Sequence, residues 1–256
     1  MFKKQLETIE VNKLTINPIY QRLLTKSYKD ITKNFNEKKL GEITLSYRDF
    51  KFYIIDGHNR AEACNKIGIK KIDSVIYFGL TLEEEAELFV ALNTNTSVKR
   101  NDKFKAKLVY KDAQSIAIND IAIKNNFKIS NETHKSIDNC IRAVEALEFA
   151  YKLDNGITLD LTLKTIFEAW NGQKESVHQR IIRPMAMFLN KYPEIDIDEL
   201  KTKLINYDPS VISRRGTEIT RLLGGGTYEN SARAILNIYN SSKRKNKLED
   251  RFIKNK

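Results

Sequence analysis

The chain changes its local pattern once, near residue 100, and this change constrains the fold more than any other feature. Before it, short runs rich in β-branched and aromatic residues alternate with helical stretches. After Asn101 the strand signals nearly vanish and helical periodicity dominates. The 256 residues have room for both parts. We therefore predict a small mixed α/β domain at residues 1–100 and an all-helical domain at 101–240, with the boundary between residues 95 and 105.

The first part is expected to follow the order β, α, β, β, α, β, α. The predicted strands are 6–16, 42–47, 51–55 and 72–78, and the predicted helices are 25–39, 56–67 and 81–92. The predicted helices of the second part are 104–119, 136–153, 161–170, 176–192, 197–205, 214–223 and 230–239. Pro184 falls inside one of them and is expected to kink or divide it.

The charge balance narrows the choice of partners. Lys and Arg total 44 against 33 Asp and Glu, a net charge of +11 with a pI near 9.4, which favours a nucleic-acid partner. No stretch approaches the roughly 18 apolar residues of a membrane span, and the start of the chain lacks the apolar region of a signal peptide. Two cysteines, Cys64 and Cys140, cannot supply a disulfide framework. We expect a cytoplasmic protein with no membrane partner.

The positive charge is concentrated in three places. The last 16 residues hold seven basic and two acidic side chains, and we predict a basic tail at 241–256. Four lysines recur every fourth residue from 99 to 111 and would form one stripe on a helix. A third group follows Ser213. We predict that these residues contact DNA phosphates: Lys99, Arg100, Lys103, Lys107, Lys111, Arg214, Arg215, Lys243, Arg244 and Lys245. An ordinary solvated helix face is the alternative interpretation of the stripe.

The segment Asp56-Gly57-His58-Asn59-Arg60 joins a predicted strand to a predicted helix. A helix N-terminus attracts anions, and glycine lets a phosphate approach the backbone. Arg60 could bind phosphate oxygens, Asp56 could hold a magnesium ion, and His58 could move a proton. The alternative is that Asp56 caps the helix and Gly57 forms the turn.

Two further polar segments are candidates for the same site. Asn17 to Arg22 follows the first predicted strand and offers Gln21 and Arg22 to a ligand, and a packed loop is the alternative interpretation. Asn93 ends the helix 81–92 and is either its C-cap or a residue that lines the same pocket.

These three segments, in this order, resemble the ParB/sulfiredoxin superfamily. Asn17 to Arg22 is similar to its first motif, Asp56 to Arg60 to its second, and Leu88 to Asn95 to a stretch found in phage ParB-like proteins. The resemblance covers residues 6–105 and implies a ParB/sulfiredoxin-like N-terminal domain, in a protein of a phage or mobile element.

The resemblance also implies a ligand, a nucleoside triphosphate with magnesium. Carried over residue by residue, the phosphates would contact Gly57, His58, Asn59, Arg60, Gln21, Arg22 and Asn93, and Asp56 would serve the metal or act with His58 in catalysis. The sequence departs from the family at His58, where sulfiredoxin has its cysteine, so sulfinic acid reduction is not expected. ParB itself has Glu-Arg where this chain has His58-Asn59, so its switching behaviour is not carried over.

Three hypotheses follow. The first is a ParB-like nucleotide-binding protein associated with DNA, with a homodimer as the candidate oligomer. The second is an enzyme of the same fold: an NTPase, a phosphotransferase or a nuclease. The third is a non-catalytic adaptor that binds another protein.

Overall fold

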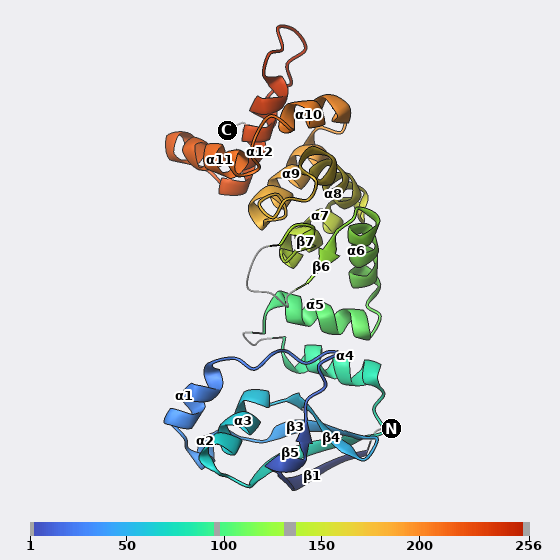
Figure 1. Cartoon of the computed structure of the whole chain (residues 1–256), viewed down its shortest axis with the longest axis vertical. Coiled ribbons are helices and arrows are strands. Elements are labelled where there is room, and N and C mark those ends of the chain that lie inside the picture. The colour runs from blue at the N-terminus through green and yellow to red at the C-terminus, as the bar shows by residue number, and fades with distance from the viewer. Residues whose placement is uncertain (1–2, 95–97, 131–136, 253–256) are drawn as a thin grey trace. The chain divides into compact units, whose positions relative to one another are not determined.

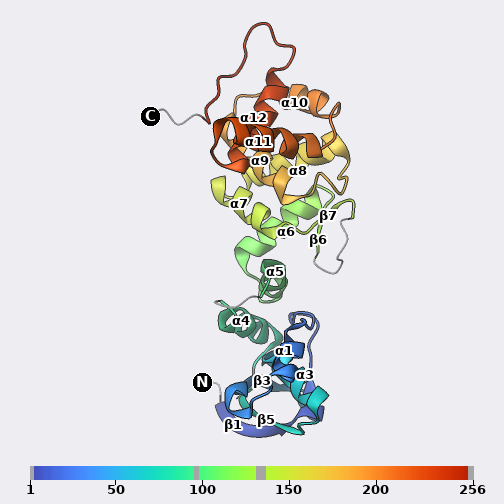
Figure 2. The same cartoon turned by 90° about the vertical axis from the view of Figure 1, so that its left-hand side faces the viewer.

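The computed structural model describes residues 3–94, 98–130 and 137–252. It divides into two compact units, Met1–Ser115 and Ile116–Lys256, which Figures 1 and 2 show from two directions. Within the described residues, no helix is both long and apolar enough to cross a membrane.

The first unit contains the predicted mixed set of strands and helices. Its strands are β1 (Lys3–Glu10), β2 (Leu14–Thr15), β3 (Ile43–Arg48), β4 (Lys51–Asp56) and β5 (Lys71–Phe78). Its helices are the 3₁₀ turn η1 (Val11–Lys13), α1 (Ser27–Lys33), α2 (Glu37–Leu40), α3 (His58–Ile67), α4 (Leu82–Leu92) and α5 (Arg100–Val109).

The five strands form one mixed sheet in the order β1-β5-β3-β4-β2. β1 pairs antiparallel with β5, β5 parallel with β3, β3 antiparallel with β4, and β4 parallel with β2. Asp49 and Phe50 form the β3–β4 turn with positive φ angles of 51° and 59°, the conformation that two-residue hairpins favour. The predicted hairpin is therefore confirmed.

The sheet is covered on both faces, and β4 shows how. Neighbouring residues of a strand point to opposite sides. Ile54 packs in a cluster with Ala61 and Cys64 of α3, whereas Ile55 packs in a second cluster with Phe89 of α4. Both isoleucines are buried, so β4 is a central apolar strand that ends in the polar Asp56.

Two predicted helices are each two helices in the structure. The predicted helix 25–39 breaks after Lys33, because Asn34 leaves helical geometry and Asn36 is extended. The predicted helix 104–119 breaks at Lys111, whose φ is +62°. Asp112 then caps the next helix by accepting hydrogen bonds from the Ser115 N–H and hydroxyl at 2.9 and 2.6 Å.

The second unit is helical apart from two strands of two residues each. Its elements are α6 (Ala113–Lys124, which begins in the first unit), β6 (Lys128–Ile129), β7 (Cys140–Ile141), α7 (Val144–Asp154), α8 (Ile157–Trp170), α9 (Gln179–Lys191), α10 (Ile197–Leu204), α11 (Ser210–Leu223) and α12 (Thr227–Asn240). The predicted helix 136–153 was wrong in its first half, where the chain forms β7 instead; Ser136 itself lies outside the described residues.

α9 is the centre of the second unit, since it packs against α7, α8, α11 and α12. Pro184 lies inside this helix and does not divide it, contrary to one of the two predicted outcomes. α11 and α12 approach closely where Gly216 of α11 meets Ser231 of α12. A Cβ atom on Gly216 would lie 2.7 Å from the Ser231 Cα.

The described part of the predicted basic tail folds back on the second unit. The Tyr192 hydroxyl donates to the Glu249 carbonyl at 2.8 Å and accepts from the Arg251 N–H at 2.8 Å. Phe252 is buried beside the Tyr192 ring. The segment 241–252 is thus packed against the unit along part of its length.

We predict that Gly216→Ala destabilises the protein, although alanine is the better helix former by roughly 1 kcal/mol. The added methyl group overlaps backbone atoms of Ser231, and overpacking of this kind costs about 1–3 kcal/mol. Urea unfolding should show the loss. The control is Thr217→Ala, one residue along on the exposed face, which should change stability by less than about 0.5 kcal/mol. Equal stability of Gly216→Ala and the wild type would contradict the close packing.

Candidate functional site

The turn between β4 and α3 depends on Gly57. Its φ of +99° is a left-handed conformation that favours glycine. A Cβ atom there would lie 2.3 Å from the Ile43 Cγ2 atom. No side chain caps the N-terminus of α3, so its first N–H groups are not satisfied in that way. The predicted strand, turn and helix are confirmed at this position.

Arg60 lies in the first turn of α3 and binds other parts of the same unit. Its Nη2 donates to Asp56 Oδ2 at 2.7 Å, and its Nη1 donates to the Glu42 carbonyl at 2.6 Å. Both side chains are about a third or less exposed. The predicted phosphate-binding arginine and metal-binding aspartate are therefore paired with each other, and Arg60 also fixes the residues that lead into β3.

Gln21 holds the loop after β2 against the end of β4. Its Nε2 donates to the carbonyls of Ile54 and Ile55 at 3.0 and 3.1 Å, and its Oε1 accepts from the Arg22 N–H at 3.0 Å. Gln21 is 4% exposed. The polar atoms of Gln21 are therefore used inside the protein, and its predicted contact with a ligand stays a prediction.

Asn59 has a comparable role on the other side of the loop. Its Oδ1 accepts from the N–H and the hydroxyl of Thr25 at 3.3 and 3.1 Å. Thr25 was not singled out by the sequence as a site residue. Its contact closes the segment between β2 and α1 over the first turn of α3.

His58 and Arg22 have polar groups that remain available. His58 Nδ1 is buried, and within the described residues it has no hydrogen-bond partner. Burial lowers the pKa of His58 below its usual value, a hydrogen bond with the Arg22 backbone opposes this shift, and the Arg22 charge adds to it. The Arg22 guanidinium makes no hydrogen bond or ion pair with any described residue.

Asn93 ends α4 and is buried at 2% exposure. Its Nδ2 donates to the Phe89 carbonyl of the same helix at 2.8 Å. The two predicted roles of Asn93 are a C-cap and a residue that lines the pocket. Its contact with a carbonyl of the last turn of α4 is typical of a C-cap.

The lysine stripe is not continuous. Lys99 precedes α5 and Lys111 follows it, where its Nζ lies 3.7 Å from Glu83. Lys103 donates to the Thr94 carbonyl at 3.3 Å. Lys105, which lay outside the predicted stripe, donates to the Pro18 carbonyl at 2.6 Å and ties α5 to the β2–α1 loop. The four lysines therefore do not all lie on one helix, because α5 contains only Lys103 and Lys107, and their contact with DNA phosphates stays a prediction.

The predicted cations of the second unit differ in exposure. Arg214, Arg244 and Lys245 are exposed, and they form no ion pair within the described chain. Arg215 lies over the Tyr207 ring, 5.0 Å from its centroid. Lys243 is paired with Glu199 at 2.8 Å and covers the Tyr239 ring.

No group of three or more His, Cys, Asp or Glu side chains that could hold a metal occurs in the described part of the chain. Asp56 therefore stands as a single carboxylate. A magnesium ion that arrives with phosphate oxygens needs only one or two protein carboxylates.

We predict that Gly57→Ala is more harmful than Gly68→Ala, at the other end of α3. Both positions have positive φ, at 99° and 81°, but a Cβ atom on Gly68 meets nothing within 4 Å. Left-handed geometry alone costs alanine about 1–2 kcal/mol. The clash with Ile43 should add at least about 1 kcal/mol at residue 57. Denaturant unfolding of both variants tests this, and equal losses would contradict it.

Comparisons with known proteins give a family and a fold likeness. The model of a family of unknown function, DUF6551, matches residues 16–252. A structure of the C222₁ form of a pNOB8-like ParB N-domain is similar at 15% identity and a TM-score of 0.44, over 92% of this chain and 98% of that one. A second structure of the pNOB8-like ParB N-domain gives 16% identity and a TM-score of 0.36, over 87% and 79% of the two chains. No curated protein matches significantly.

Proposed function

The chain belongs to the DUF6551 family of unknown function, and from this starting point we propose that its first unit binds the phosphates of a nucleotide at the N-terminus of α3. One observation carries the proposal. The buried His58 Nδ1 lies in the uncapped first turn of α3, Arg22 acts on His58 through its backbone and its charge, and neither the Arg22 guanidinium nor His58 Nδ1 has a hydrogen-bond partner among the described residues. A guanidinium, free N–H groups and a positive helix end together favour an anion with several oxygen atoms.

The remaining polar residues of the site would set its shape. Gln21 and Asn59 fix the loop that presents Arg22, since their bonds run to β4 and to Thr25. Asp56 has one oxygen bonded to Arg60, and its second oxygen is the candidate ligand for a magnesium ion carried by a triphosphate. The ion would offset the negative charge of the phosphates and of Asp56.

We further propose that the protein is associated with DNA. The net charge of +11 and the exposed cations Arg214, Arg244 and Lys245 support this part. Such residues would contact phosphates and would carry little sequence information. Hydrolysis or transfer of a phosphate, with His58 as the base, is the enzymatic form of the same proposal.

The nucleotide proposal predicts a thermal shift. ATP, CTP, GTP and UTP, each with magnesium, are added to the wild-type protein, and one that binds at 100 times its Kd should raise the Tm by roughly 5 °C. Arg22→Gln should abolish the shift, because it removes the free guanidinium. Lys29→Gln removes an exposed charge from α1 and should retain the shift.

The unfolding midpoint without ligand is the control for the fold of each variant. Removing magnesium with a chelator should reduce the shift if Asp56 holds the ion. No shift with any nucleotide, or the same shift in Arg22→Gln, would refute the α3 site and leave the adaptor hypothesis.

A further inference from the structure

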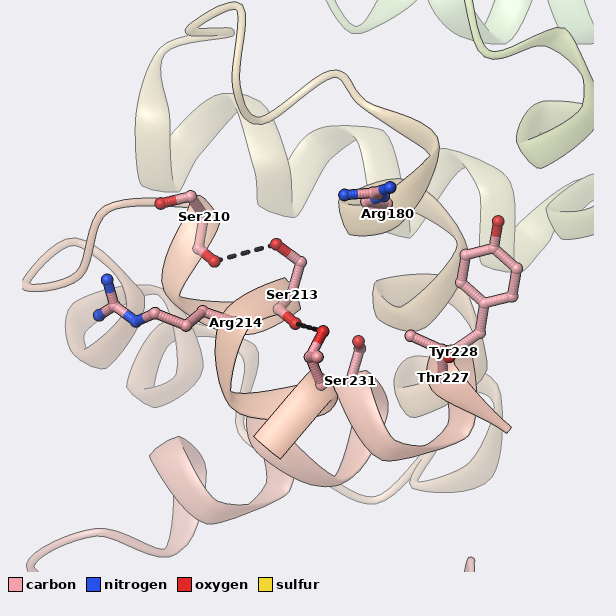
Figure 3. A pocket seen from close by; sticks show the side chains of 8 residues that line it. Arg180, Ser210, Ser213, Arg214, Thr227, Tyr228 and Ser231 are labelled. Atoms are coloured by element: carbon pink, nitrogen blue, oxygen red, sulfur yellow. Dashed lines mark hydrogen bonds between the residues drawn. The ribbon is translucent and has the colours of Figure 1, made fainter. Parts of the chain in front are cut away.

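A groove in the second unit has the chemistry of an anion site that neither the family nor the predicted α3 site explains. It consists of two hollows of about 500 and 590 Å³ that share Arg180, Ser210, Ser213 and Tyr228. Figure 3 shows these residues around the hollow, with side chains from α9, α11 and α12. The sequence grouped Arg214 with Arg215 as predicted phosphate contacts, but it could not add Arg180, which is distant along the chain.

Two helix N-termini open into this groove without a cap. α9 begins at Gln179 and α12 at Thr227, and neither has a side-chain cap. The residues in the first turn of each helix line the groove. α11 is different, because Asp208 accepts hydrogen bonds from the Ser210 N–H and hydroxyl at 2.8 and 2.5 Å. The groove therefore receives the positive ends of two helices of 13 and 14 residues.

Two guanidinium groups add full positive charge. Arg180 and Arg214 both line the first hollow, and Figure 3 shows them on different sides of it. Neither forms an ion pair within the described residues. Both are exposed, so a ligand bound between them would remain partly in water.

Ser231 supplies independent evidence of a ligand. The residue is 2% exposed, yet its side chain lines the first hollow. Its hydroxyl makes no hydrogen bond to any residue that the structure describes. The Ser231 hydroxyl is not among the fully enclosed polar atoms, so it is open to the hollow, where a ligand oxygen would form a hydrogen bond with it.

The carboxylates around the groove restrict where an anion could lie. Glu175 lines the second hollow. Asp208 caps α11, and its pKa is lowered by the hydrogen bonds from Ser210 and, to a smaller extent, by the charge of Arg214. Glu229 belongs to the first turn of α12 but does not line either hollow. The most positive part is thus the first hollow, near Ser231 and Thr227.

We propose that this groove binds a phosphate group and that the phosphate is one of a DNA backbone. Two guanidiniums, free helix N–H groups and a hydroxyl match the several oxygens of a phosphate better than the two of a carboxylate. The choice of DNA over a small phosphate rests on the proposed function, and the exposure of both arginines agrees with a ligand that stays on the surface.

The test measures binding of a labelled 20-base-pair duplex of mixed sequence to the full chain by fluorescence anisotropy. Arg180→Gln with Arg214→Gln should weaken binding by about tenfold or more and reduce its salt dependence. Lys128→Gln with Lys152→Gln removes two exposed charges that neither line the groove nor belong to the predicted DNA contacts, and it should weaken binding by less than about threefold. Ser231→Ala, which preserves all charges, should also weaken binding. Unfolding midpoints verify the fold of each variant.

A second readout uses inorganic phosphate. In amide NMR spectra, phosphate should shift the N–H signals of Gln179, Arg180, Thr227 and Tyr228 in the wild type but not in the Arg180→Gln, Arg214→Gln variant. Equal weakening of DNA binding in the two double variants, without these phosphate shifts, would overturn the site. Phosphate shifts without DNA binding would retain the phosphate site and overturn its assignment to DNA. The nucleotide-induced thermal shift is measured on the Arg180→Gln, Arg214→Gln variant as well. If the shift persists there, nucleotide binding at α3 is intact, and only the proposal for the groove has failed.

Discussion

The contact between Gly57 and Ile43 is the constraint on which the first unit depends. The chain can turn from β4 into α3 at this distance because residue 57 has no Cβ atom and adopts a left-handed conformation. The turn places Arg60 where it can bind both Asp56 and the segment before β3. It also points the uncapped end of α3 towards the loop that carries Arg22. A wider turn would separate all of these groups.

Buried polar contacts, more than regular pairing, determine the position of that loop. β2 has two residues, so strand hydrogen bonds end early, and Gln21 continues the connection to β4 through its side chain. In α4, Glu85 is fully buried and paired with Arg48 at 3.0 Å. Breaking a buried ion pair by removing one partner is strongly destabilising. The first unit therefore holds its site with interactions that tolerate little change.

Much of the architecture could be predicted because it depends on local signals. The Thr81 capping box, the turn at residues 48–50 and the glycines that flank α3 each determine a boundary within a few residues. The break at Lys111 could not be predicted, because Asp112 caps α6 only through Ser115 and the periodicity continues across it. The strands β6 and β7 are two residues long and give no periodic signal.

For the candidate site, the sequence points to the polar segments but does not show how their side chains are used. Residue type shows that Gln21, Asn59 and Arg60 are polar, but not whether their partners lie inside the protein. Those partners are backbone carbonyls and Thr25, which only the folded chain brings near. The groove residue Arg180 was missed for the same reason, since it lies on a different helix from Arg214.

The edges of the sheet have a consequence for solubility. An exposed strand edge can pair with another chain and begin aggregation. β1 forms one edge and carries Lys3, Lys4 and Glu7, while the opposite edge is the two-residue β2, followed by the bound loop. The first edge is charged and the second is too short to extend a sheet. These features oppose edge-to-edge stacking of first units, even though the exposed Leu6 side chain would otherwise favour it.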